Sequence, residues 1–318
     1  MLLRPGRDGG VVLSVKGFSA AFDTRPQKGL GFVSHAHSDH VAAGQNVLAT
    51  RETISLIRRV WQLSGGYKPI PYRQELRVSD SVSVKALNSG HVLGSAMFRL
   101  DIGGESLVYT GDINTVPTLT TNPAEPVDAD VFVIETTYGH PDYVFPPRHK
   151  TEAWILKWVS KTLAEGALPA FKAYSIGKSQ ELIKLFNTYT SLPVVVGKTV
   201  ANASKTYVEN GVKLDFIRSG TRDAAEVLGG GEAVYIDSQV RSVPVHRRVK
   251  WATVTGWAVK GCPEGFDAAF PLSSHADYRG LLNYVEENRP RKVYTIHGFS
   301  QLFAKTLRLR GFDASPFT

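Results

Sequence analysis

Cysteine is almost missing from this 318-residue chain, which contains only Cys262. A single cysteine excludes a disulfide within the chain and a zinc module built on several cysteines. Long apolar runs are missing too, since stretches such as VFVI (131–134) are far shorter than the roughly 20 residues that cross a bilayer. The first 15 residues contain no apolar stretch typical of a signal peptide. We therefore expect a soluble, cytoplasmic protein with no membrane segment.

Acidic residues are the minority among the charged ones. The chain has 37 Lys and Arg against 29 Asp and Glu, a net charge of +8. A basic excess favours an anionic partner, such as nucleic acid or an acidic membrane surface. The charge is spread along the chain apart from VHRRVK (245–250), which we interpret as a solvated loop, with a phosphate contact as the alternative.

The sequence predicts two regions with different patterns of secondary structure. Up to residue 140, apolar or alternating stretches predict strands separated by short turns, with one helix over 51–63. From residue 149 to 238, helices alternate with apolar strands, which is typical of a parallel sheet covered by helices. Within this region, 225–238 is expected to form a glycine turn and then a strand. The strands expected in the first region are 10–15, 29–34, 46–50, 82–87, 95–102, 106–111 and 130–135, and the later elements are helices 149–166, 177–189, 199–211 and 279–288 with strands 168–174, 192–197, 251–256 and 292–298.

The stretch SHAHSDH (34–40) holds three of the chain's nine histidines. His35 and His37 follow an apolar strand, and two residues apart in an extended segment their side chains point the same way. Asp39 and His40 come next, as the chain turns. Neutral imidazole and carboxylate are preferred zinc ligands, so the spacing can direct two imidazoles at one metal and a second pair of ligands at a neighbouring one.

Further metal-ligand side chains follow other predicted strands. His91 lies between two strands in SGHVLGSA, Asp112 directly follows an apolar strand in LVYTGDIN, and His297 follows another in VYTIHGFS. A single histidine or aspartate at a strand end is usually structural. Three such sites in a chain that already contains H-x-H-x-D-H indicate partners for the histidine cluster instead.

These motifs resemble a known family. H-x-H-x-D-H, then GHVLGS and TGD, form the pattern of the metallo-β-lactamase fold. IETTYG (134–139), LSSHADY (272–278) and YTIHG (294–298) are similar to motifs A, B and C of the β-CASP nucleases. The chain also resembles, nearly end to end, the ligase-associated DNA exonucleases, a group similar to mRNA 3′-end processing factors. AFDTRP, GKSQEL and TGWAVKG carry that wider similarity.

The resemblance implies an α/β architecture with two domains. A metallo-β-lactamase αββα sandwich would comprise residues 1–140 and 251–318. A β-CASP domain, a parallel sheet flanked by helices, would be inserted over 141–250 and would cap the metal site.

The resemblance also implies the ligands of two adjacent divalent ions, zinc or alternatively manganese. Asp112 would bridge them, and Asp23 would support the histidines through hydrogen bonds. The metals would lower the pKa of a bridging water, which would attack the phosphodiester. The first ion would be held by His35, His37 and His91, and the second by Asp39, His40 and His297.

Two further residues match the β-CASP motifs near the scissile phosphate. His275 would protonate the leaving oxygen, and Glu135 would hold the imidazole protonated. With Asp39 and Asp112 they form the expected catalytic set. A metallo-β-lactamase hydrolase of small molecules lacks this pair.

Nucleic-acid contacts are expected at the start of the helix GKSQEL. Helix N-terminal amides gather anions, so Ser175, Lys178 and Ser179 are candidates for phosphate contacts. Tyr174 could stack on a base. The alternative is an ordinary N-capped surface helix.

The substrate is expected to be DNA, cut by an exonuclease that acts on single strands or ends in DNA repair, with a functional association with a DNA ligase or helicase. The alternative is an RNA-processing nuclease, because the motif C residue, His297, is associated with RNA enzymes. Ser274 departs from the aspartate expected before the motif B histidine. Two minor alternatives are a small-molecule metallo-hydrolase and an inactive nucleic-acid-binding module.

Overall fold

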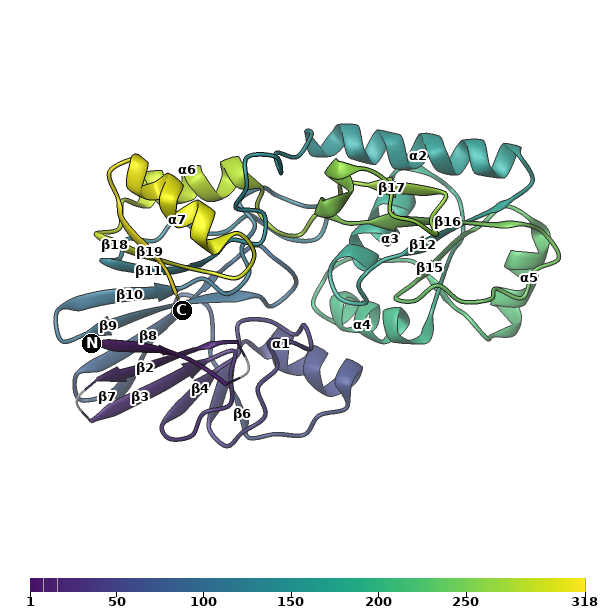
Figure 1. Ribbon diagram of the computed structural model, residues 1–318. Coiled ribbons are helices and arrows are strands. Elements are labelled where there is room, and N and C mark those ends of the chain that lie inside the picture. The colour runs from purple at the N-terminus through teal and green to yellow at the C-terminus, as the bar shows by residue number, and fades with distance from the viewer. Residues whose placement is uncertain (8, 16, 318) are drawn as a thin grey trace. The chain divides into compact units, whose positions relative to one another are not determined.

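The computed structural model describes residues 1–7, 9–15 and 17–317, which form two compact units (Figure 1). Within these residues, no helix is both long enough and apolar enough to cross a membrane. Unit 1 comprises Met1–Pro117, Thr121–Asp142 and His275–Thr318, and unit 2 comprises Thr118–Thr120 and Tyr143–Ser274.

Unit 1 contains two sheets, the first with six strands and the second with seven. In the first, β1 to β3 are antiparallel and β3 to β6 are parallel. In the second, β7 to β10 are antiparallel, whereas β10, β11, β18 and β19 run parallel. The first sheet has the order β1 (Leu2–Pro5), β2 (Val11–Val15), β3 (Phe18–Phe22), β4 (Leu30–Phe32), β5 (Val47–Ala49), β6 (Tyr67–Pro69), and the second has the order β19 (Asp313–Pro316), β18 (Lys292–Ile296), β11 (Val131–Glu135), β10 (Glu105–Tyr109), β9 (Ala96–Ile102), β8 (Val82–Asn88), β7 (Glu75–Ser79).

An aromatic core joins the two sheets. Phe22 and Phe32 of the first sheet stack at 5.0 Å between ring centroids, and Tyr109 of the second stacks on Phe22 at 4.9 Å. β11, which is apolar from Val131 to Ile134, is buried on both faces. Val131 and Val133 enter this core, whereas Phe132 and Ile134 pack under α6 (Tyr278–Asn288) and α7 (Ser300–Leu309). An apolar run without alternation is typical of such a central strand.

The helix predicted over 51–63 is divided in the structure. It consists of α1 (Arg51–Leu56), capped by the Thr50 hydroxyl, and a π-helical turn, η1 (Ile57–Trp61), that ends at Gln62 in the left-handed region. With α1 contacting β6 and with α6 and α7 covering the second sheet, unit 1 is the expected αββα sandwich.

Unit 2 is a six-stranded parallel sheet with helices on both faces. Residues of α2, α3 and α4 share one apolar core with the sheet, and residues of α5 share the other. The strand order is β14 (Ile217–Arg218), β13 (Val194–Val196), β15 (Val234–Asp237), β12 (Leu168–Lys172), β16 (Val249–Val254), β17 (Ala268–Phe270), and the helices are α2 (Arg148–Ala164), α3 (Lys178–Tyr189), α4 (Lys198–Glu209), α5 (Arg222–Gly230) and the 3₁₀ turn η2 (Gly256–Lys260).

Two sequence expectations differ from this structure. The expected return to the first domain at residue 251 is too early, because β16 pairs with β12 from Val249 to Thr253 and β17 pairs with β16, so the chain returns at His275. In the stretch 225–238, expected as a glycine turn and then a strand, the strand is present as β15, but the glycines before it continue α5 as far as Gly230. The Thr221 side chain caps this helix, and Ala224 and Leu228 bury its apolar face. Tertiary burial outweighs the low helix propensity of the glycines.

Candidate metal centre

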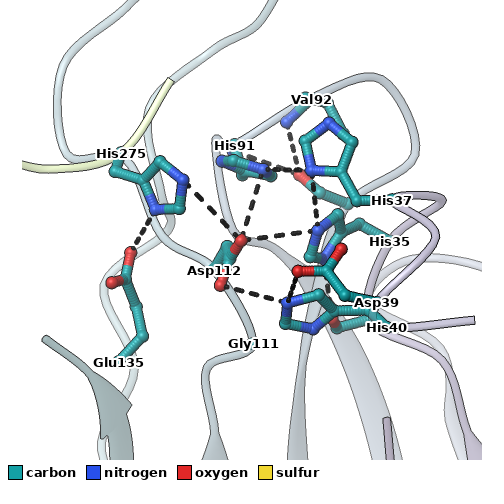
Figure 2. A network of polar contacts seen from close by, with 12 residues as sticks. His35, His37, Asp39, His40, His91, Val92, Gly111, Asp112, Glu135 and His275 are labelled. Carbon is teal, nitrogen blue, oxygen red and sulfur yellow. Dashed lines mark hydrogen bonds and ion pairs between the residues drawn. The ribbon is translucent and has the colours of Figure 1, made fainter. Parts of the chain in front are cut away.

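The predicted ligands follow strands whose ends meet at one edge of the sandwich in unit 1. His35 to His40 follow β4, His91 follows β8, Asp112 follows β10 and His297 follows β18. Figure 2 shows how the first three of these loops direct their side chains to a common point around Asp112. The sequence cluster and the isolated strand-end residues therefore belong to one site.

A first group of four possible ligands comprises His35, His37, His91 and Asp112. The Nδ1 atom of His37 lies 3.0 Å from Nε2 of His35 and 3.1 Å from Nε2 of His91. Oδ2 of Asp112 lies 3.4 Å and 3.5 Å from the same two Nε2 atoms. Tetrahedral ligands about 2.0–2.1 Å from a zinc ion lie about 3.3 Å from one another. The donor set therefore fits a zinc ion.

A second group lies on the other side of the Asp112 carboxylate. Oδ1 of Asp112 is 3.7 Å from Nε2 of His40, which is also 3.9 Å from the Asp39 carboxylate. The Asp39 side chain is 80% exposed. His297 is exposed, with a positive φ of 60°, and its ring centroid is 5.9 Å from that of His40. The two oxygens of Asp112 thus face different ligand groups, as a bridging carboxylate requires.

Buried hydrogen bonds fix the histidines from behind. Asp23 accepts from the Ser34 amide at 2.7 Å, the Ser34 hydroxyl at 2.6 Å and the Tyr109 hydroxyl at 2.9 Å, and it bonds Nδ1 of His40 at 2.9 Å. Because the Ser34 hydroxyl donates to Asp23, its oxygen accepts from Nδ1 of His35 at 2.9 Å. With protons on both Nδ1 atoms, Nε2 of His35 and of His40 is directed at the site as a donor to metal.

Without a metal, the pKa values of His35 and His40 are shifted in opposite directions. Burial lowers the pKa of His35 well below its usual value, and the neighbouring imidazoles lower it further. Burial also lowers the pKa of His40, but the Asp112, Asp23 and Asp39 carboxylates outweigh it and raise that pKa to about 10. Burial raises the pKa of Asp112. The carboxylates around His40 thus favour a positive charge at that position, which a bound cation would also supply.

His275 and Glu135 form a hydrogen-bonded pair beside this cluster. Nδ1 of His275 lies 2.9 Å from Oε1 of Glu135, and its Nε2 lies 3.8 Å from Oδ2 of Asp112 (Figure 2). Glu135 is fully buried at the end of β11 and accepts from the Thr137 amide at 2.8 Å. Burial alone would raise the pKa of Glu135, but His275 and the Thr137 hydrogen bonds lower it to about 2. Glu135 is therefore ionised and faces the imidazole.

We expect Asp23→Asn to weaken zinc binding by about 10- to 100-fold, the usual effect of losing a partner of a metal-binding histidine. The variant loses the carboxylate that orients His40 and Ser34. Competition with a chromogenic chelator measures the affinity. Tyr109→Phe, which removes one of the four bonds to Asp23, should cost less, and unchanged zinc affinity in Asp23→Asn would contradict the proposed support.

The four candidate nucleic-acid contacts lie in unit 2, Tyr174 and Ser175 in the loop between β12 and α3, and Lys178 and Ser179 at the start of α3. Tyr174 is 63% exposed, and Nζ of Lys178 lies 4.4 Å from its ring centroid. Ser175 and Ser179 are buried. The Ser179 hydroxyl donates to the Tyr174 carbonyl at 2.7 Å, so this serine shapes the loop. Gln180 closes the loop by accepting from the Gly177 amide and donating to the Ser175 carbonyl.

Sequence reasoning did not identify three residues that support the site. Ser34 is adjacent to the predicted His35 and Thr137 lies two residues after the predicted Glu135, which is a weak signal that could have been used. Tyr109 lies in an apolar strand 86 residues from Asp23, and nothing in the sequence indicates that its hydroxyl is buried against this carboxylate.

Comparison with known proteins agrees with this site. Residues 268–310, which include His275 and His297, match a family model described as "Zn-dependent metallo-hydrolase RNA specificity domain". The chain is 36% identical over 297 residues to the "Probable DNA ligase" of Opitutus terrae, covering 91% of this chain and 28% of the relative. It is 24% identical over 359 residues to the "RNase J-like protein" of Methanocaldococcus jannaschii, covering 88% and 85%.

Two further similarities extend this picture. The chain is 34% identical over 295 residues to the "Integrator complex subunit 11 homolog" of Dictyostelium discoideum, covering 72% of this chain and 39% of the relative. It thus spans only about a third of the first and the third of these relatives. A crystal structure of a protein of unknown function from Enterococcus faecalis V583 superposes with a TM-score of 0.66 at 12% identity, over 93% of each chain, which shows a shared fold. Together, the sandwich, the donor groups and these matches show a metallo-β-lactamase fold, and the chain resembles the β-CASP nucleases, including their ligase-associated group.

Proposed function

We propose that this chain is a metal-dependent nuclease that hydrolyses phosphodiester bonds of DNA, at single strands or ends. The observation that carries the proposal is the His275–Glu135 pair beside two ligand groups that share Asp112. The ligand groups suit the binding of a phosphate, and the pair suits protonation of an alcohol leaving group.

The metals and the chain's own residues would have separate roles in this reaction. Two zinc ions, when bound, would polarise the phosphate and lower the pKa of a bound water. Asp112 and Asp39 supply two negative charges against them, which leaves the centre positive enough to attract a phosphodiester. Glu135 accepts from Nδ1–H of His275, and in the doubly protonated imidazolium the second proton, on Nε2, would be available for the leaving oxygen. The ionised Glu135 also stabilises the imidazolium.

The preference for DNA rests on one relative. The alignment with the protein named "Probable DNA ligase" covers 91% of this chain, and it favours a role in DNA repair in functional association with a ligase. Tyr174 and Lys178 would contact the strand by stacking and by charge, with Ser175 nearby.

An RNA-processing nuclease with the same site is the second candidate. The matched family model is described as an RNA specificity domain, and the names of two similar proteins refer to an RNase and to an Integrator subunit. The residue at motif C, His297, is consistent with this alternative.

A cleavage assay tests the proposal and distinguishes the two candidates. DNA and RNA strands of one sequence, labelled at either end, are incubated with zinc, manganese or EDTA. We expect metal-dependent cutting of DNA, with a product ladder that gives the polarity. Cutting of RNA alone would favour the second candidate, and no metal-dependent cutting of either strand would contradict the nuclease proposal.

In the same assay, Asp39→Ala and His40→Ala should each lower the cleavage rate by about 10³-fold or more, since each removes a ligand of the second group. Both proteins should stay folded because neither change opens a large core cavity. Asp142→Ala is the matched control, an exposed carboxylate of unit 1 that pairs with His140 at 3.7 Å. Undiminished turnover in either ligand variant would contradict the two-metal assignment.

A further inference from the structure

Two exposed aromatic residues follow neighbouring strands of unit 2. β12 and β16 are parallel and adjacent, with Lys172 opposite Thr253. Tyr174 lies two residues beyond Lys172, and Trp257 lies four residues beyond Thr253. Both rings therefore leave the sheet at the same carboxyl edge, which is where parallel α/β sheets bind ligands.

Trp257 lies in a cluster of aromatic rings and positive charge. It is 44% exposed on η2, and the ring of Tyr143 meets it edge-to-face at 5.0 Å between centroids. Nζ of Lys260 lies 5.6 Å from the centroid of the Tyr143 ring. The contact with Tyr143 holds the Trp257 indole in a defined orientation, and part of the indole stays open to solvent. Lys260 supplies a cation beside these rings.

The Tyr174–Lys178 pair has the same chemistry. Its ring is 63% exposed, with the Lys178 ammonium 4.4 Å from the centroid. The unit around both clusters is basic. Residues 143–274 contain 17 Lys and Arg against 11 Asp and Glu, which is +6 of the chain's net +8. The edge thus combines two partly exposed aromatic rings with an exposed lysine, Lys260, and a buried one, Lys178, in a positively charged unit.

A nucleotide cofactor of the kind bound by other parallel sheets does not suit this edge. The N-terminus of α4, a natural phosphate site, is occupied by the chain itself. A Cβ on Gly197 would lie 2.4 Å from the buried carboxylate of Asp237, so this carboxylate fills the space in which a phosphate would bind. The aromatic and basic side chains at this edge of the sheet favour a ligand that presents bases as well as phosphates.

We propose that Trp257, Tyr143 and Lys260 form a base-stacking subsite for single-stranded nucleic acid, next to that of Tyr174 and Lys178. The inference rests on the proposed function and adds a second binding position to it. Trp257 and Tyr174 each stack one unpaired base, and the exposed Lys260 contacts the backbone. Stacking is tolerant of sequence, and bases paired in a duplex are not available to it.

Binding of the 318-residue chain to a fluorescent oligonucleotide in EDTA tests this subsite without cleavage. The probes are oligo-dT and oligo-rU of roughly 12 nucleotides, within the span of known single-strand sites. Trp257→Ala should weaken binding by about 5- to 100-fold, the usual cost of one lost stack. Trp257→Phe keeps a ring and should retain most of the affinity. A plot of log affinity against log salt has a negative slope, and Lys260→Gln should make this slope shallower by about 0.7.

Trp154→Ala is the matched control, because Trp154 is 46% exposed on α2 of the same unit. It should bind as the unmodified chain does. Unchanged binding in Trp257→Ala, or an equal loss in Trp154→Ala, would overturn the subsite. Failure of the nuclease proposal would look different: the chain would bind the oligonucleotide through Trp257 but would not cut it with zinc or manganese.

Discussion

Asp112→Asn is expected to lower the rate of phosphodiester cleavage by about 10³-fold or more, because one carboxylate serves both ligand groups. Its Oδ2 atom faces His35 and His91, and its Oδ1 atom faces His40. An amide has the same shape but keeps only one oxygen and no charge, so it cannot serve both sides. The variant should also bind fewer than two equivalents of zinc, measured by elemental analysis after dialysis.

Asp130→Asn provides a control for the loss of a carboxylate from the same unit. Asp130 accepts from the amide and the hydroxyl of Ser106, both at 2.8 Å, and takes no part in the ligand groups. This variant should keep both the zinc content and the cleavage rate. Two bound equivalents of zinc and an unchanged rate in Asp112→Asn would refute the bridging role.

The sequence was sufficient to predict that the candidate ligands lie close together, because they share a simple geometric property. Each follows an apolar strand, and strands in one sandwich that run the same way end at the same edge. His91 and Asp112 could therefore be placed beside the H-x-H-x-D-H cluster although they are far from it in the chain. Distances bear out this convergence for the groups around Asp112.

What the sequence could not show depends on contacts between distant residues. Tyr109 resembles any other apolar strand residue until the fold brings it to Asp23. The boundary at residue 251 was misplaced because β16 has the composition of a strand from either unit, and only its pairing with β12 assigns it. The glycines of α5 indicated a turn, since propensity ignores the burial of Leu228.

His275→Asn is expected to slow cleavage of a natural phosphodiester by about 10²- to 10⁴-fold, the usual contribution of a positioned general acid. The nucleotide leaving group is a poor one and needs the proton from Nε2. A p-nitrophenyl nucleotide ester has a leaving group stable as an anion, so the same variant should lose much less activity on it. Rates on both substrates, with zinc content checked, measure this difference.

Glu135→Gln should show the same dependence on the leaving group, with a smaller loss, because the imidazole remains but loses the buried charge that stabilises its protonated form. His275 lies only 3.8 Å from Asp112, so a purely structural role in holding that ligand is the competing explanation. A structural role would lower the rates on both substrates equally and would reduce the zinc content. Unequal losses at full zinc content would instead establish His275 as the proton donor, since only protonation of the leaving oxygen distinguishes the two esters.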